Sequence, residues 1–204
     1  MEILKKCIRF IIRGLIWIYI KIVYRLKVVG KENVPKTGSV IFCGNHRSLL
    51  DAPMIVVTAP RHVRFFAKEE LNKNFIIKFL AFCFGIIFVK RDEKDVQALK
   101  ESLKALKNGD CLGIFPEGTR NGFEKNNGKV KNGAAYLAIK TGADVIPIGI
   151  CGSLKPFRKN MIIYGKPVDY SKFKELKKLD KEQEIEASNI LKEEILKLAA
   201  TEVK

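Results

Sequence analysis

The segment FCGNHRSLLDAP, at residues 42–53, brings one of the chain's two histidines within five positions of an aspartate. On one continuous helix, His46 and Asp51 would point about 140° apart and could not pair. If His46 lies in a loop and a helix begins near Ser48, the chain can bring the two side chains together. An Asp51 carboxylate that accepts the Nδ1 proton would orient the imidazole and leave Nε2 as a general base.

The same residues also fit a purely structural interpretation. Ser48 would then be the N-cap of a helix and Asp51 its third residue, in a variant of the capping box in which aspartate replaces glutamate. Taken alone, the segment favours this capped helix start over a catalytic pair.

A second polar segment, FPEGTR, follows an apolar run and ends at residue 120. Gly118 allows the backbone to approach a ligand closely, and the planar guanidinium of Arg120 suits a phosphate group. Arg91, at the end of GIIFVKR, supplies a second guanidinium, so the two arginines predict a phosphate clamp. The anionic Glu117 is expected to orient an arginine or a substrate hydroxyl instead. The alternative is that these charged side chains form surface salt bridges.

A central sheet would position both polar segments. Short apolar runs rich in β-branched and aromatic residues predict strands. These runs are residues 39–43, 63–67, 85–89, 111–115, 144–150 and 161–165. Helical patterns at residues 91–110 and 129–141, and an amphipathic helix near the C-terminus, complete an α/β order with a mainly parallel central sheet flanked by helices. Ligands gather beyond the carboxyl ends of parallel strands, so the polar segments are expected to share one site.

The N-terminal segment, residues 1–30, combines cations with large apolar side chains. Four cations share one face of a helix, and an apolar stripe lies opposite them. The cations are Lys5, Lys6, Arg9 and Arg13. The uncharged run at residues 14–20 is too short to span a bilayer, and no signal-peptide cleavage site follows.

This pattern predicts amphipathic helical structure at a membrane interface, with a bend near Gly14 or a second helix. The basic face would lie toward anionic headgroups, and Trp17 and Tyr19 suit the headgroup boundary. The alternative is a helix that packs on the protein's own core and exposes its basic face to solvent.

The amino-acid composition of the chain limits the classes of partner that the protein is expected to bind. The 204 residues include 38 lysines and arginines against 22 acidic residues, a formal net charge of +16 that favours an anionic partner. A nucleic-acid-binding module would explain the charge, but aromatic residues interleaved with lysine and arginine on exposed strands are not evident. The five cysteines lack zinc-site spacing and indicate a reducing compartment. Cys43, although close to His46, is expected in the core.

Four blocks of sequence resemble, in their order, the 1-acylglycerol-3-phosphate acyltransferases, or lysophosphatidic acid acyltransferases, of the glycerolipid acyltransferase superfamily. The first block is Asn45 and His46 followed by Asp51, and the third is FPEGTR. The second block consists of Gly85, Phe88, Val89 and Arg91, and the fourth is VIPIGI with Pro147. The first and third blocks together are highly specific for the family.

The resemblance implies transfer of an acyl group from acyl-CoA or acyl carrier protein to the 2-hydroxyl of a lysophosphatidate, giving phosphatidic acid for phospholipid synthesis. It makes His46 the general base and Asp51 the residue that orients it, with no metal, cofactor or acyl-enzyme. Other residues are expected to bind the substrate, with the arginines holding its phosphate. These residues are Asn45, Ser48, Arg91, Glu117, Gly118, Thr119 and Arg120.

The expected organisation is a membrane-binding segment at residues 1–30 and a catalytic domain at residues 31–204. The protein would lie at the cytoplasmic face of the membrane as a peripheral or monotopic protein, without nucleic acid as a partner. Residues 75–88 would either line a tunnel for the acyl chain of the substrate or form part of the hydrophobic core. The rival interpretations are the same chemistry on glycerol 3-phosphate or another lysophospholipid, and an inactive membrane scaffold.

Overall fold

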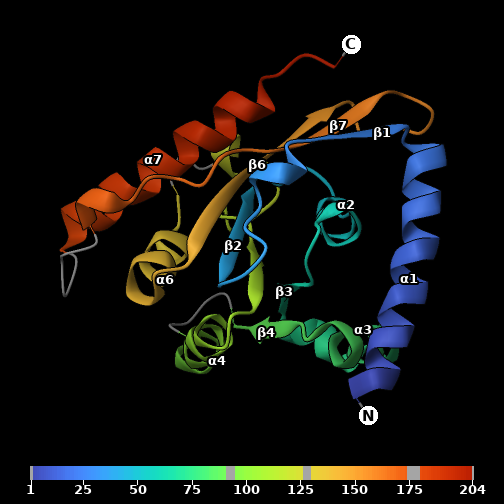
Figure 1. The fold of residues 1–204 in the computed structure, drawn as a ribbon, viewed down its shortest axis with the longest axis horizontal. Helices are drawn as coiled ribbons and strands as arrows, with labels where there is room; N and C mark the ends of the chain where they lie inside the picture. The colour runs from blue at the N-terminus through green and yellow to red at the C-terminus, as the bar shows by residue number, and fades with distance from the viewer. Residues whose placement is uncertain (1, 91–94, 126–129, 174–179, 204) are drawn as a thin grey trace.

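The computed structural model describes residues 2–90, 95–125, 130–173 and 180–203. The strands are β1 (Leu26–Val29), β2 (Val40–Gly44), β3 (Val63–Lys68), β4 (Ile87–Val89), β5 (Cys111–Ile114), β6 (Asp144–Gly152) and β7 (Asn160–Tyr164). They form one sheet in the order β1-β7-β6-β2-β5-β3-β4 (Figure 1). Neighbouring strands are parallel except β6 and β7, so the predicted α/β fold with a mainly parallel sheet is confirmed.

Helices cover both faces of this sheet (Figure 1). They are α1 (Glu2–Val23), α2 (Asp51–Thr58), α3 (Phe75–Phe84), α4 (Val96–Lys107), α5 (Gly122–Lys125), α6 (Gly133–Thr141) and α7 (Lys181–Ala199). Short 3₁₀ turns occupy Lys31–Asn33, Glu69–Lys73 and Ser171–Phe173. Successive side chains of β2 alternate between two cores. Ile41 packs under α4, α6 and α7, whereas Phe42 packs under α1 and α2. Burial on both faces explains why this strand is apolar throughout.

All six predicted strands are present, but one strand was missed. Residues 26–29, assigned to the membrane-binding segment, form β1 and pair with β7 in parallel. Leu26 is fully buried, so the prediction that residues 1–30 are helical is wrong beyond Val23. The sheet therefore begins before the expected boundary at residue 31.

Helix α1 is one continuous helix, so the expected bend or second helix near Gly14 is absent from the described residues. Its outward face is apolar, with Phe10 80% exposed. The other large apolar side chains exposed on it are Ile3, Leu4, Ile11, Leu15, Ile18, Tyr19 and Ile22. Arg9 and Arg13 are instead half-buried on the side of the helix that faces the protein. The alternative is therefore correct in that α1 packs on the core through Ile20, but Arg9 and Arg13 do not form a basic face open to solvent.

The apolar segment at residues 75–88 forms core, one of the two expectations, only near its C-terminal end, where Cys83, Phe84 and Ile87 are buried. Most of it forms α3, which packs against α1 and ends at Gly85 in the left-handed conformation. Phe75 is 83% exposed, and Ile76, Phe79 and Phe82 are also exposed. The part of this segment in α3 is therefore largely a second exposed apolar surface beside α1. Among the described residues, no helix is both long and apolar enough to cross a bilayer.

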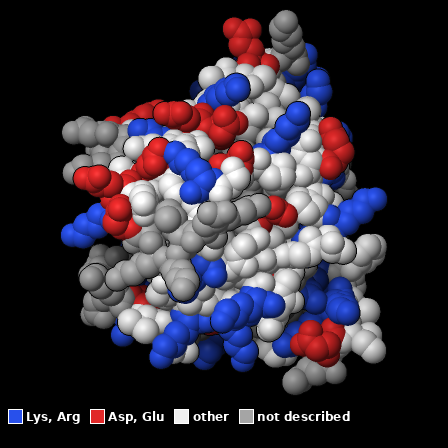
Figure 2. Space-filling view, turned by 60° about the vertical axis from the view of Figure 1, so that its left-hand side comes forward, with Lys and Arg blue, Asp and Glu red and all other residues white. Residues whose placement is uncertain are grey.

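The positive charge of the chain is unevenly distributed. Residues 1–31 contain eight lysines and arginines and a single acidic residue, Glu2. Figure 2 shows another face, on which acidic side chains gather toward the top of the view and basic ones toward the bottom. The N-terminal helix is thus the most strongly basic element as well as the one with the most exposed apolar surface.

Candidate active site

The two polar segments meet at the carboxyl edge of the sheet. His46 follows β2, and Glu117 follows β5, the parallel neighbour of β2. The loops contact directly, since the Asn121 amide donates to the His46 carbonyl at 2.6 Å. The prediction that strand ends bring these segments together is confirmed for the residues described. Arg91 lies outside them.

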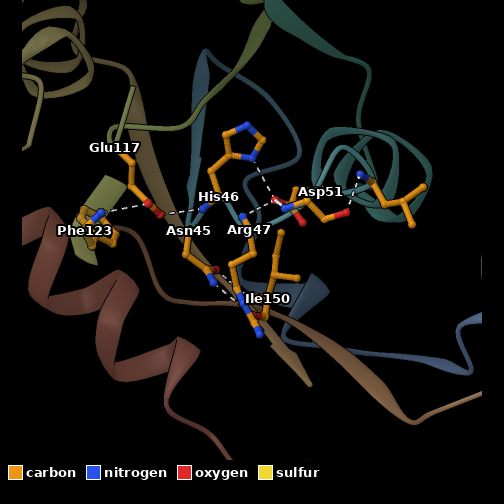
Figure 3. Close-up of polar contacts among 9 residues, drawn as sticks. Asn45, His46, Arg47, Asp51, Glu117, Phe123 and Ile150 are labelled. Carbon is orange, nitrogen blue, oxygen red and sulfur yellow. Dashed lines mark hydrogen bonds and ion pairs between the residues drawn. The ribbon is translucent and has the colours of Figure 1, made fainter. Parts of the chain in front are cut away.

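His46 and Asp51 form the expected pair. The imidazole Nδ1 lies 2.9 Å from Asp51 Oδ2 (Figure 3). The same oxygen accepts the backbone amides of Arg47 and Ser48 at 2.6 and 2.7 Å. Helix α2 begins at Asp51, three residues later than the predicted start near Ser48. The carboxylate thus caps the turn before the helix and orients the histidine at the same time.

The proton on the imidazole is fixed by this arrangement. A carboxylate can only accept, so Nδ1 carries the hydrogen and Nε2 has the lone pair. Nε2 has no hydrogen-bond partner among the described residues, and it points away from Asp51 (Figure 3). The His46 ring stacks on Phe115, with centroids 4.2 Å apart and planes 11° apart. This packing restricts rotation of the ring.

Glu117 and Asn45 hold the histidine loop to its neighbours. Glu117 is 3% exposed, and its two oxygens accept the amides of His46 at 2.6 Å and Phe123 at 3.1 Å. Asn45 exchanges two hydrogen bonds with the backbone of Ile150 in β6. Among the described residues, no arginine forms a salt bridge with Glu117. The visible role of both side chains is to position His46, whereas substrate binding was predicted for them.

Arg47 forms a further hydrogen bond between the His46 loop and β6, which the sequence did not predict. Its guanidinium donates to the carbonyl of Gly152 at 2.8 Å, while its backbone amide contacts Asp51. The loop is therefore fastened to β6 from both sides of His46 (Figure 3).

A cavity of about 370 Å³ opens beside His46. It lies between the sheet and helices α4 and α6, and its lining is mainly apolar. The lining includes Phe65, Phe66, Leu99, Ile114, Phe115 and Leu137. Small side chains of the two helices, Ala98 and Ser102 on α4 and Ala134 on α6, leave this space unfilled. None of residues 75–88, which were expected to line an acyl tunnel or form core, lines this cavity.

Two lysines that the sequence interpretation did not single out also line this cavity, Lys90 and Lys131. Lys131 passes close over Gly118, where an added Cβ would lie 2.5 Å from the lysine side chain. Gly118 has a φ of +70°, which favours glycine. Thr119 and Arg120 are exposed after it. No motif marks Lys131, which precedes α6 in a lysine-rich stretch.

Two other chemistries receive no support from the described residues. Burial raises the pKa of the Cys43 thiol, which is fully buried and therefore unsuited to nucleophilic attack. No group of three or more His, Cys, Asp and Glu side chains with metal-binding geometry occurs in the part of the chain that the structure describes.

Comparison with known proteins gives consistent matches. A family model described as acyltransferase matches residues 25–151. A 1-acyl-sn-glycerol-3-phosphate acyltransferase of Borreliella burgdorferi is 33% identical over 141 residues, 68% of this chain and 56% of that protein. A Bacillus subtilis protein of the same name is 29% identical over 74% of this chain and 77% of its own. The chain thus spans about half the length of the Borreliella relative.

A solved structure shares the fold. The crystal structure of the 1-acyl-sn-glycerophosphate acyltransferase PlsC from Thermotoga maritima aligns with a TM-score of 0.65 and 31% identity. The alignment covers 88% of this chain and 74% of that one.

The hydrogen bond between His46 and Asp51 predicts a single imidazole tautomer. We expect ¹⁵N NMR of the neutral imidazole to report a protonated Nδ1 and an unprotonated Nε2 for His46. In Asp51→Asn, the amide can donate as well as accept, so both tautomers should be populated. His62 supplies an internal control, because its signals should not change. A wild-type mixture of tautomers would contradict the assignment.

Proposed function

The chain belongs to the acyltransferase family, and on that premise we propose that it acylates the 2-hydroxyl of a 1-acylglycerol 3-phosphate. The donor is an acyl thioester, acyl-CoA or acyl carrier protein, and the product is phosphatidic acid for phospholipid synthesis. The observation that carries the proposal is the His46 imidazole, held by Asp51 with Nε2 free beside an apolar cavity. The names of the relatives support the choice of acceptor.

The geometry suits general-base catalysis without an acyl-enzyme. Nε2 of His46 takes the proton of the acceptor hydroxyl as its oxygen attacks the thioester carbonyl. Asp51 stabilises the imidazolium that forms, at 2.9 Å from Nδ1. Collapse of the tetrahedral intermediate breaks the carbon–sulfur bond, and the thiolate takes the proton from His46. The sequence of steps requires neither a metal nor a cofactor.

The cavity beside His46 suits an acyl chain. Its apolar lining between α4 and α6 would exclude water from a hydrocarbon chain and bring the attached carbonyl to His46. Lys131, on the rim with Gly118, is a candidate phosphate ligand alongside Arg120 and Arg91. Thr119 and Ser48 remain predicted contacts of the acceptor.

The exposed faces of α1 and α3 support a location at the membrane surface. Together they form a broad apolar surface, joined where Lys5 Nζ lies 4.2 Å from the centroid of the Phe82 ring. The flanking cations would contact anionic headgroups while the apolar faces enter one leaflet. The free cysteines agree with the reducing, cytoplasmic side of the membrane. A membrane location would also bring a lipid acceptor to the site.

Replacing His46 with alanine tests the chemistry. We expect a loss of transferase activity of about 10²- to 10⁴-fold, the usual contribution of a general base. The fold should be retained with a moderate loss of stability, because Asp51 Oδ2 keeps the backbone amides of Arg47 and Ser48 when the imidazole is removed. The assay uses one acyl donor with a panel of lysophosphatidate, glycerol 3-phosphate and another lysophospholipid. Near-normal turnover by His46→Ala would remove the general-base assignment, and a preference for glycerol 3-phosphate would replace the proposed acceptor.

Phosphate binding is tested by Lys131→Ala and Arg120→Ala. Each should raise the KM for lysophosphatidate about tenfold or more, since each removes a charged hydrogen-bond donor. The matched control is Lys140→Ala, which removes an exposed lysine from the far end of α6. If KM is the same in all three variants, the phosphate site lies elsewhere.

Membrane attachment is tested by Ile11→Asp combined with Leu15→Asp. Both residues are exposed, so folding should be preserved while apolar transfer worth about 1.5–3 kcal/mol per side chain is lost. Flotation with liposomes should fall at least about tenfold. The matched control places aspartate at Val96 and Ile185, exposed apolar positions on α4 and α7. Equal flotation of both double variants would exclude α1 as the attachment surface.

A further inference from the structure

A second cavity, of about 540 Å³, lies far from His46. It separates α1 from the connection between α2 and β3, and we call it the basic hollow. Its lining includes Lys6, Arg9, Phe10, Arg13, Trp17 and His62. Val63, next to His62, is in register with Cys111, which is in register with Val40 at the start of β2. The basic hollow is therefore at the amino edge of the sheet, opposite the edge that carries His46.

Positive groups in the basic hollow lack an acidic counterpart. None of the described residues that line it is acidic. Glu2, the only acidic residue of α1, is paired with Lys5 at 3.2 Å, and Asp110 is paired with Arg64 at 3.2 Å. Burial, together with the nearby Arg9 and Arg13 and against a smaller opposing effect of Asp110, lowers the pKa of His62 to about 4. The field in the hollow is thus strongly positive.

A hydrogen bond holds Arg13 at the inner wall. Its Nη2 donates to the carbonyl of Ala59, the residue that ends α2, at 2.8 Å. This bond uses one of the five N–H groups of the guanidinium. Within the described residues, Arg9 and Lys6 form no salt bridge. Several donors therefore remain available for an anion.

The apolar residues around the basic hollow indicate what kind of molecule would carry the anion. Phe10 lines the hollow and is also 80% exposed on the apolar face of α1. Trp17 lines it one helical turn beyond Arg13. A ligand that fills the hollow would place its anionic group among the cations and its apolar part along α1. Phospholipids combine these two parts, whereas nucleic acids and free phosphate lack the apolar part.

We propose that the basic hollow binds the phosphate of an anionic phospholipid whose acyl chains lie along the apolar face of α1. The inference rests on the proposed membrane location. It adds a lipid site that is distinct from the catalytic one and that selects the headgroup of the surrounding membrane. An occupied site would neutralise the repulsion among Lys6, Arg9 and Arg13 and fasten α1 to the bilayer.

Trp17 reports binding directly, because it is the only tryptophan of the chain. Titration of the full chain with dihexanoyl phosphatidylglycerol should give a saturable change in Trp17 emission. Dihexanoyl phosphatidylcholine, which has no net charge, should give none. In NMR titrations the first probe should also raise the pKa of His62 from about 4, because an anion stabilises the imidazolium. Inorganic phosphate that saturates the signal at the same concentration would overturn the lipid assignment.

The diagnostic variant combines Lys6→Gln with Arg9→Gln and leaves the Arg13 contact to α2 intact. Its affinity for the phosphatidylglycerol probe should fall about tenfold or more. The matched control removes two charges from the opposite side of the sheet, Lys104→Gln with Lys107→Gln, and should change affinity less than about twofold. Equal affinities in wild type and diagnostic variant would overturn the proposal.

Activity separates this site from the catalytic one. The diagnostic variant should acylate a water-soluble, short-chain lysophosphatidate at the wild-type rate, because His46 lies at the other edge of the sheet. If this rate falls along with probe affinity, the hollow is part of the catalytic site and the proposal fails. Wild-type protein that binds the probe but transfers no acyl group would contradict the proposed function while supporting the lipid site.

Discussion

One oxygen atom organises the active edge of the molecule. Oδ2 of Asp51 accepts three hydrogen bonds, from the His46 imidazole and from the amides of Arg47 and Ser48. Because Asp51 is fully buried, its geometry cannot relax into solvent, and the loop must keep its shape for the carboxylate to stay satisfied. Its other oxygen, Oδ1, is buried without a partner among the described residues. The buried Asp51 carboxylate therefore orients one imidazole, that of His46.

The rest of the site is held together by hydrogen bonds between strand ends that are far apart in the sequence. Asn45 and Arg47 attach the His46 loop to β6, and Glu117 attaches it to the loop after β5. The parallel order β6-β2-β5 brings these three strand ends side by side. A rigid edge of this kind lets the neighbouring cavity remain unfilled, since α4 and α6 contact the sheet through small residues without closing over His46.

Sequence patterns captured the features that depend on local chemistry. Apolar runs such as residues 39–43 were recognisable because burial on both faces leaves no polar alternation. The pairing of His46 with Asp51 was also predictable once a loop preceded the helix. Residues 26–29 were not, because LKVV continues the basic and apolar composition of α1 and becomes a strand only through its distant partner β7. The buried face of α4 was not predictable from large apolar residues either, because the small residues Ala98 and Ser102 are buried whereas Val96 and Leu99 are exposed. Glu117 was assigned to substrate because nothing in FPEGTR reveals that backbone amides use both of its oxygens.

The position of β1 has a consequence for the order of events during synthesis. Leu26 pairs with Asn160, so the strand that follows α1 finds its partner only after more than a hundred further residues have left the ribosome. Until then, β1 has no strand to pair with, because β7 is its neighbour in the sheet order. Under the membrane location proposed above, a bilayer would offer α1 a surface during this interval, and the sheet would close on a helix that is already attached. The membrane would thus act as a folding partner before it serves as the source of substrate.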